Sequence, residues 1–339
     1  MNKNLFPTIS IIIPCYNEVK FIHKCLISLI KNNYPKDKIE ILVYDGGSKD
    51  GSLDILKDFE KKYKFIRIRH NPYKFQVKAL NIGIKEAKGE IIIRCDAHAE
   101  YPSNYISEIV KHLLEGKAAN VGGVYDAHPS ENTCIAKAIA FALKHPFGVG
   151  ISCRLPTQTR PRFVDTVPFG AWKKEIFKEV GLFDERFIRA QDLEHNVRLK
   201  KHGKKILLLP YLRIKYYTRS TFKKLTLMAY QYGYVQVLVF RKHKILPSCR
   251  KILPSLFVFG ILFCGISDVL KFVYLLYLLL GIGSGVKISL KEKKLCFLFL
   301  MPTAFFIIHF FYGIGCLKAL IDWMIFRKPL TKINWAESR

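Results

Sequence analysis

Residues 9–18 read ISIIIPCYNE and residues 39–52 read IEILVYDGGSKDGS, and in both stretches a run of β-branched residues ends in polar side chains. Such runs favour β-strands, and strands that are apolar at nearly every position are buried on both faces. The polar residues that follow would stand at the carboxyl ends of these strands, where open α/β sheets bind their ligands. These two stretches therefore predict both the fold class and the place of the functional site.

The first two-thirds of the chain repeat this alternation. Short β-branched runs predict strands at residues 10–13, 39–44, 65–68 and 91–95. Apolar residues recur at helical spacing between them, in residues 19–31, 52–63 and 76–88. Strands that alternate with helices predict an α/β domain, residues 1–220, with a twisted and mainly parallel sheet that helices cover on both faces. Residues 121–210 are less regular and rich in glycine, proline and arginine.

The chain is strongly basic. Its 339 residues include 55 lysines and arginines against 27 acidic residues, a formal net charge of +28. That balance indicates an anionic partner such as nucleic acid, lipid headgroups or a phosphate-bearing substrate. Hydrophobic residues make up 50% of the chain, and they gather after residue 253. The combination favours a membrane surface over nucleic acid, for which the sequence carries no recognition motif.

The cysteines and the N-terminus indicate a reducing compartment. The nine cysteines are scattered and include no CxxC pair, which is typical of reduced structural thiols rather than of disulfides or a metal site. The N-terminal apolar run is short and meets Pro14, so it does not resemble a cleavable signal peptide. We therefore expect the globular part to lie in the cytoplasm.

The C-terminal third is expected to associate with a membrane. A basic amphipathic stretch, residues 221–251, is expected to lie along the membrane interface, and it precedes three apolar segments at residues 252–267, 269–286 and 295–317. Their lengths predict two or three membrane-associated helices within residues 252–326, followed by a polar tail at 327–339. The flanking basic clusters favour a multi-pass protein of the cell inner (plasma) membrane over a helical hairpin buried in a globular core. Re-entrant or interfacial helices are a further alternative.

Four polar clusters follow predicted strands or open a predicted helix. They are PCYNE at residues 14–18, DGGSKDGS at residues 45–52, CDAHAEYP at residues 95–102 and AQDLEHN at residues 190–196. The glycines of the second cluster would let backbone N–H groups approach phosphates. Each cluster alone is a weak signal, but their order and spacing together are specific. We expect Asp45, Asp96 and Asp192 to converge on one cleft.

At these residues the sequence resembles the family 2 glycosyltransferases of the GT-A fold. The resemblance covers residues 8–203 and includes PCYNE, the DGGSKDGS loop, ALNIGIKEAKGE at residues 79–90 and the acidic motif near residue 96. The chain also resembles a narrower group, the ExoA-like transferases of succinoglycan biosynthesis. That likeness rests on RCDAHAEYP, QDLEHN, HPFGVG at residues 145–150, VDTVPFGAW at residues 164–172 and HFFYGIG at residues 309–315. It extends over nearly the whole chain.

The resemblance implies a nucleotide-sugar donor, with UDP as the expected nucleotide. The family pattern places around it Pro14, Tyr16, Asn17, Glu18, Asp45, Gly46, Asn81 and Asp96. The family's DXD motif corresponds to residues 96–98, which read Asp-Ala-His here, so Asp96 and His98 are the expected ligands of a divalent metal. Imidazole suits Mn²⁺ better than Mg²⁺, and manganese is therefore favoured. Alternatively, His98 only forms hydrogen bonds behind the metal ligands.

The same resemblance makes Asp192 the catalytic base. A carboxylate beside the acceptor hydroxyl can take its proton as the anomeric carbon is attacked, in a single displacement that inverts the configuration. The alternative is that Asp192 is a helix N-cap. Residues expected near the acceptor or the donor sugar are Phe169, Gly170, Arg189 and Gln191. The QxxRW motif of processive members is missing after the base, which favours the addition of a single sugar.

The sequence therefore predicts an inverting, metal-dependent enzyme that transfers one sugar from a UDP-sugar to a lipid-linked saccharide in surface or exopolysaccharide assembly. Its partners would be membrane lipids and, in addition, other polysaccharide-assembly proteins, with no nucleic acid. Two alternatives are transfer directly to polyprenyl phosphate and a non-catalytic scaffold of a polysaccharide assembly complex.

Overall fold

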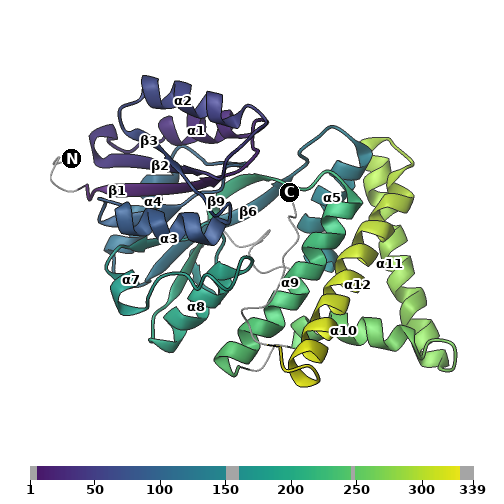
Figure 1. The fold of residues 1–339 in the computed structure, drawn as a ribbon. Coiled ribbons are helices and arrows are strands. Elements are labelled where there is room, and N and C mark those ends of the chain that lie inside the picture. The colour runs from purple at the N-terminus through teal and green to yellow at the C-terminus, as the bar shows by residue number, and fades with distance from the viewer. Residues whose placement is uncertain (1–5, 150–159, 246–248, 329–339) are drawn as a thin grey trace. The chain divides into compact units, whose positions relative to one another are not determined.

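The structure is a computed structural model that describes residues 6–149, 160–245 and 249–328 (Figure 1). The chain forms two compact units. The sheet unit comprises Met1–Asp126 and Ser152–Tyr216, and the helical unit comprises Ala127–Ile151 and Tyr217–Arg339. Residues 127–151, which lie inside the predicted 1–220 domain, thus belong to the helical unit. Most of the predicted polar tail, 327–339, lies outside the described residues.

The N-terminal half of the sheet is parallel. Its strands are β1 (Ile9–Cys15), β2 (Ile39–Asp45), β3 (Ile66–His70) and β4 (Ile91–Arg94), in the spatial order β3-β2-β1-β4. The intervening helices are α1 (Ile22–Ile30), α2 (Ser52–Lys62) and α3 (Gln76–Glu86). All four predicted strands and all three predicted helices are present within a few residues of their predicted bounds. The crossover helices explain the parallel pairing, because a parallel neighbour needs a long connection.

The other half of the sheet is antiparallel. Its strands are β5 (Ala99–Glu100), β6 (Asn120–His128), β7 (Arg162–Phe163), β8 (Ala171–Lys173) and β9 (Ile206–Tyr217). The order continues β4-β8-β6-β9-β5, with β7 on β9, and the pairs β4–β8, β6–β8, β5–β9 and β7–β9 are antiparallel. The predicted α/β class is confirmed, but the sheet is mixed rather than mainly parallel. Residues 121–210 looked irregular because Gly122, Gly123 and Pro210 interrupt strands β6 and β9 with residues that strands disfavour.

Helices cover both faces of the sheet, as the continuously apolar strands require. On one face Ile11 and Ile13 pack with Leu26 of α1, Leu56 of α2 and residues of α4 (Tyr105–Leu114). On the other face Ile12 and Leu42 pack with α3, α7 (Ile176–Glu179) and α8 (Gln191–Lys201) (Figure 1). The two cores leave the carboxyl ends of the parallel strands as the place where polar side chains can gather.

The helical unit is built around one long helix, α12 (Phe297–Met324). Its neighbours are α5 (Cys134–Lys144), α6 (Pro146–Val149), α9 (Phe222–His243), α10 (Cys249–Ile261) and α11 (Asp268–Glu292). Glycines let the backbones of α9 and α12 approach closely: a Cβ on Gly233 would stand 2.0 Å from the Tyr312 carbonyl oxygen, and one on Gly315 would stand 2.1 Å from that of Tyr230. The predicted amphipathic stretch 221–251 contains α9, whose second half is therefore buried in this unit.

Two helices of this unit, α11 and α12, are long and apolar enough to cross a membrane. The first apolar segment forms α10, which has 13 residues with Pro254 inside and is too short to span. Large apolar side chains are exposed where α10 ends and α11 begins: Leu262 is 76% exposed, Ile266 84% and Val269 73%. Such a concentration is unusual for a surface that faces water. Together these features suggest association with a membrane.

The contact between α9 and α12 gives a testable prediction. Gly315→Ala should destabilise the helical unit by about 1–3 kcal/mol, because the new methyl group would have to push α9 away. Gly283→Ala is the matched control, since it lies in α11 and a Cβ there meets no atom within 4 Å. Thermal unfolding of the full chain in detergent should show a lower Tm for Gly315→Ala alone. Equal Tm values for both variants would contradict this account of the packing.

Candidate active site

Polar side chains gather at the carboxyl ends of three adjacent parallel strands. Asp45 ends β2 and pairs in register with Cys15, the last residue of β1, after which Tyr16, Asn17 and Glu18 follow. Two residues beyond the end of β4, the next strand in the sheet, lies Asp96. The topology therefore brings three of the four predicted clusters to one edge of the sheet.

The loop after β2 is held in one conformation by its own side chains. The Asp45 carboxylate accepts hydrogen bonds from the backbone N–H groups of Gly47 and Ser48, at 2.9 and 3.0 Å, and from the Ser48 hydroxyl at 2.5 Å. Asn17, at a left-handed φ of 54°, accepts from the Lys49 N–H at 2.9 Å and donates its own N–H to the Ser48 hydroxyl. The loop and the turn after β1 thus form one unit. The Tyr16 ring packs over the loop, and a Cβ on Gly46 would stand 3.3 Å from it.

The central feature of the site is a guanidinium between two aspartates. Arg94, the last residue of β4, places Nη2 3.2 Å from an oxygen of Asp96 and Nη1 3.6 Å from an oxygen of Asp192. Arg94 is 7% exposed, and a buried guanidinium requires such anionic partners. The fourth polar cluster, which carries Asp192, is thereby brought beside Asp96.

A second connection between Asp96 and helix α8 runs through the side-chain amides of Gln76 and Gln191. Gln76, at the start of α3, donates its side-chain N–H to Asp96 at 2.9 Å, and its carbonyl oxygen accepts from the Gln191 amide at 3.0 Å. Asp96 and the N-terminus of α8 are therefore linked twice, through Arg94 and through Gln76. Sequence reasoning assigned no role to either residue. A lone arginine ending an otherwise apolar strand, IIIR, was a usable signal for Arg94, because such a charge needs a partner.

His98 and Glu18 form a pair at the same edge. The His98 Nδ1 atom lies 3.0 Å from a carboxylate oxygen of Glu18, and the imidazole packs edge-on against the Tyr216 ring at 4.5 Å between centroids. Glu18 is held in turn by its own N–H, which donates to the Ser52 hydroxyl at 2.8 Å. A carboxylate on Nδ1 favours the tautomer that carries the proton there and keeps the lone pair on Nε2.

Asp96 and His98 could supply only part of the ligands that a divalent metal needs. Within residues 6–149, 160–245 and 249–328, no three His, Cys, Asp or Glu side chains are grouped so that they could hold a metal ion. An ion would draw one carboxylate from Asp96 and one imidazole nitrogen from His98, and the remaining ligands would have to come from a bound diphosphate and water. The residues fit an ion that arrives with its nucleotide, and the Glu18–His98 pair matches the carboxylate support usual for a ligating imidazole.

Asp192 lies in the first turn of α8. The helix begins after Ala190, which has a left-handed φ of 52° and no side chain that can cap. Asp192 is therefore not the N-cap, and the capping alternative is wrong. Its side chain is 31% exposed, against 9% for Asp96. Of the two aspartates that Arg94 joins, Asp192 is the one that solvent or an acceptor can reach.

Several polar residues of α8 anchor the helix rather than face a ligand. The Arg198 guanidinium pairs with Glu194 and donates to the carbonyl oxygens of Val180 and Leu182, both at 2.6 Å. The Asn196 amide contacts Asn120 and Thr166 at 2.7 and 2.8 Å. These contacts of Arg198 and Asn196 fix the position of the helix that carries Asp192.

The remaining predicted residues lie around this centre. Asn81 exchanges two hydrogen bonds with the backbone of Phe183, at 2.9 and 3.0 Å, and so holds the loop before α8. Phe169 is buried with a left-handed φ of 51°, its carbonyl oxygen accepts from the Tyr105 hydroxyl, and the Gly170 carbonyl oxygen accepts from the N–H of Arg94. Arg189 is half-buried directly before Ala190. Direct contacts of these residues with a nucleotide or a sugar stay predictions.

Comparison with known proteins identifies the family. The sequence profile described as "Glycosyl transferase family 2" matches residues 10–181, which contain three of the four polar clusters. The chain belongs to glycosyltransferase family 2. Its enzymatic class is therefore glycosyl transfer, and the predicted family is confirmed.

Relatives of this glycosyltransferase match it along almost its whole length. A Methanococcus voltae protein named dolichyl N-acetyl-alpha-D-glucosaminyl phosphate 3-beta-D-2,3-diacetamido-2,3-dideoxy-beta-D-glucuronosyltransferase is 34% identical, over 92% of this chain and 97% of that protein. Succinoglycan biosynthesis protein ExoA of Rhizobium meliloti is 27% identical, over 92% of this chain and 94% of its own, which confirms the predicted likeness. Among solved structures, mannosyltransferase PcManGT from Pyrobaculum calidifontis shares the fold, with a TM-score of 0.62, 17% identity, and coverage of 93% and 88%.

The buried histidine of α8 gives a prediction on acid stability. His195 is enclosed by Trp172, Phe177 and Phe183, and burial, with Arg198 nearby, lowers the pKa of His195 to about 3. Between pH 6.5 and 3 the unfolded chain binds a proton that the folded chain does not, so stability falls as the pH falls. From pH 7 to pH 5 the loss from this group should be about 2 kcal/mol.

His195→Phe should remove that part of the acid sensitivity. Chemical unfolding of the full chain at pH 7 and pH 5 would measure it, with His23→Phe, an exposed position on α1, as the control. The His23 variant should lose as much stability as the native chain, and the His195 variant about 2 kcal/mol less. Identical pH dependence in all three proteins would mean that the folded chain protonates His195 readily.

Proposed function

We propose that the protein is an inverting, metal-dependent glycosyltransferase that moves one sugar from a UDP-sugar to a lipid-linked saccharide at the cytoplasmic face of a cell membrane. The observation that carries the proposal is the position of Arg94, whose guanidinium lies between Asp96 and Asp192. Inversion needs one group that holds the leaving diphosphate and another that accepts a proton from the attacking hydroxyl. Two aspartates that share one buried cation supply such groups side by side.

The roles of the chain's own residues follow from the contacts. Asp192 is the more exposed aspartate and accepts the proton of the acceptor hydroxyl, while Arg94 and the anchored helix α8 hold its carboxylate in position. Gln76 and Arg94 orient Asp96 toward the diphosphate. Glu18 holds the His98 ring in place. A divalent metal, when bound by Asp96 and His98, offsets the negative charge that develops on the departing diphosphate.

The nucleotide is expected over the loop that follows β2. The backbone there is held by Asp45 and Asn17, and glycines at positions 46 and 47 carry no side chain that would keep a ligand away from the backbone. The PcManGT structure is a complex with GDP-Man and Mn²⁺, which supports a nucleotide-sugar and manganese for this chain as well. The choice of uracil as the nucleobase is tested by a donor screen that compares UDP-sugars with GDP-sugars and measures release of the nucleotide diphosphate.

The acceptor is proposed from the relatives and the helical unit. The name of the Methanococcus voltae protein specifies a dolichyl phosphate that carries N-acetylglucosamine, and that of the Rhizobium meliloti protein specifies succinoglycan biosynthesis. Two candidate membrane helices in this chain fit an acceptor that resides in a membrane. Mass measurement of extracted lipid products separates addition to a lipid-linked saccharide from addition to polyprenyl phosphate. The scaffold alternative requires that no donor is turned over with any lipid fraction.

The role of Asp192 is testable by an isosteric change. Asp192→Asn should leave donor binding within about twofold and lower turnover at least about a hundredfold, because the amide fills the same space but cannot accept the proton. Glu179→Gln is the matched control, since Glu179 is an exposed carboxylate on the neighbouring helix α7 that pairs with Lys204. Donor binding by calorimetry and turnover by nucleotide release separate the two effects. Equal losses of binding and turnover in Asp192→Asn would make Asp192 a donor-binding or structural residue.

The metal ligands are testable by changing one donor atom. Chelation should abolish activity reversibly, and Mn²⁺ should restore more of it than Mg²⁺. His98→Asp should shift the preference toward Mg²⁺, because that ion prefers oxygen ligands. The ratio of donor affinities measured in Mn²⁺ and in Mg²⁺ reports the change without relying on turnover. An unchanged ratio in His98→Asp would remove His98 from the set of metal ligands.

A further inference from the structure

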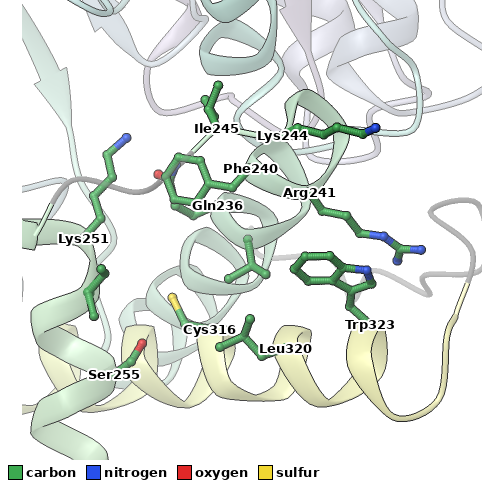
Figure 2. Close-up of a pocket in the computed structure, with 12 residues that line it drawn as sticks. Gln236, Phe240, Arg241, Lys244, Ile245, Lys251, Ser255, Cys316, Leu320 and Trp323 are labelled. Atoms are coloured by element: carbon green, nitrogen blue, oxygen red, sulfur yellow. The ribbon is translucent and has the colours of Figure 1, made fainter.

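A cavity of about 600 Å³ lies within the helical unit, between the C-terminal part of α9, the start of α10 and the C-terminal part of α12 (Figure 2). Most of its wall is apolar and comes from all three helices. Val237 and Phe240 belong to α9, Ile252 to α10, and Leu320 and Trp323 to α12. The cavity is far larger than a packing defect, and it plays no part in the site described above.

Three cations also line this cavity. Arg241 is in the last turn of α9, Lys244 is its C-cap at a left-handed φ of 51°, and Lys251 lies near the start of α10. None of the residues described as lining the cavity is acidic. Two of these cations contact aromatic wall residues. The Arg241 guanidinium lies 5.6 Å from the Trp323 ring centre, and the Lys251 Nζ lies 5.1 Å from that of Phe240.

The acidic residue closest in sequence to the cavity lining already has cationic partners. Asp322, next to Trp323, is buried, and its carboxylate pairs with Lys318 and Lys328 and accepts from the Tyr234 hydroxyl. The Arg241 guanidinium also donates to the Lys328 carbonyl oxygen at 2.9 Å, which is a neutral acceptor. The cavity therefore presents positive charge beside an apolar wall, which is complementary to a molecule with an anionic head and a hydrocarbon chain.

The position in the fold indicates what that molecule is. The cavity lies at one end of α12, a candidate membrane span, where Trp323 and the basic residues gather. Tryptophan and clustered basic residues are typical of the headgroup level of a membrane. We propose that this cavity binds one anionic phospholipid of the surrounding bilayer, with its phosphate among Arg241, Lys244 and Lys251 and the start of an acyl chain against the apolar wall.

The volume agrees with this occupant. A cavity of about 600 Å³ is too small for a whole two-chain phospholipid, so it would take the phosphate and at most one of the two acyl chains. The rest of the lipid would stay in the bilayer. The inference rests on the association of α12 with a membrane and not on sugar transfer, so it can fail or hold independently of the proposed function.

The test uses the full chain in nanodiscs of phosphatidylcholine with and without one-fifth phosphatidylglycerol. Retention of phosphatidylglycerol is measured by native mass spectrometry, and its binding by the rise in Tm. The intact chain should retain about one phosphatidylglycerol molecule and no excess of phosphatidylcholine. Replacing Arg241, Lys244 and Lys251 with glutamine should weaken retention about a hundredfold, because each basic residue near an anionic lipid contributes about fivefold.

Two variants separate a built cavity from general attraction to charge. Replacing Lys287, Lys291 and Lys293 of the α11 C-terminal region with glutamine removes the same charge elsewhere in the unit and should leave retention unchanged. Ser255→Leu keeps all the charge but fills part of the cavity, and it should weaken retention at least about tenfold. Retention that falls equally in the two triple glutamine variants, or that is unaffected by Ser255→Leu, would overturn the proposal.

Other occupants are distinguished in the same assay. Inorganic phosphate at millimolar concentration should not displace the lipid, since it lacks the chain. A polyisoprenyl phosphate that displaces phosphatidylglycerol at equal concentration would make the cavity an acceptor site and overturn the choice of a bilayer phospholipid. Removal of residues 330–339 should leave retention unchanged. A severalfold increase would mean that the C-terminal tail fills the cavity in the intact chain, which would also overturn the proposal.

Discussion

The buried guanidinium of Arg94 is the constraint on which the candidate site depends. A cation removed from water is costly unless anions replace its hydration, and Arg94 has Asp96 on one side and Asp192 on the other. Loss of one partner from such a buried pair typically costs about 3–5 kcal/mol. Folding therefore brings the two aspartates together, although one follows a parallel strand and the other opens a helix near the end of the sheet unit.

The supports around this cation make the arrangement rigid. Arg198 holds α8 to the backbone before it, Asn81 holds the same loop from α3, and Gln76 spans the gap between α3 and the start of α8. Each is a polar residue in contact with backbone or another polar side chain. Asp192 therefore stands on a fixed helix, and Asp96, just beyond the end of β4, is held by side chains from the fixed elements α3 and β4. A site that has to align a donor and an acceptor benefits from such fixed elements, because small displacements of reacting atoms cost a large part of the rate.

The parts that sequence could and could not predict differ for physical reasons. Strands β1 to β4 were found because their side chains are apolar in an uninterrupted run, whereas β6 and β9 were missed because of Gly122, Gly123 and Pro210. These glycines are needed for packing: a Cβ would stand 2.7 Å from the Pro168 carbonyl oxygen at position 122 and 2.4 Å from that of Leu212 at position 123. Those contacts are long-range and leave no local pattern. The same holds for Gln76, whose partners are distant in sequence, while Asp96 and Asp192 were found because they belong to short motifs.

The division of the chain into two units has a consequence for how the enzyme can be dissected. The polypeptide passes between the units three times, after residues 126, 151 and 216, so the sheet unit is not one contiguous stretch. A fragment that ends at Tyr216 would retain α5 but lose α12, against which α5 packs in the helical unit. The ring of Phe141 in α5, which lies 5.9 Å from that of Phe297 in α12, would then lose that cover. The two units are thus not consecutive stretches of the chain, and genetic exchange of one C-terminal part for another would have to replace an internal segment at the same time.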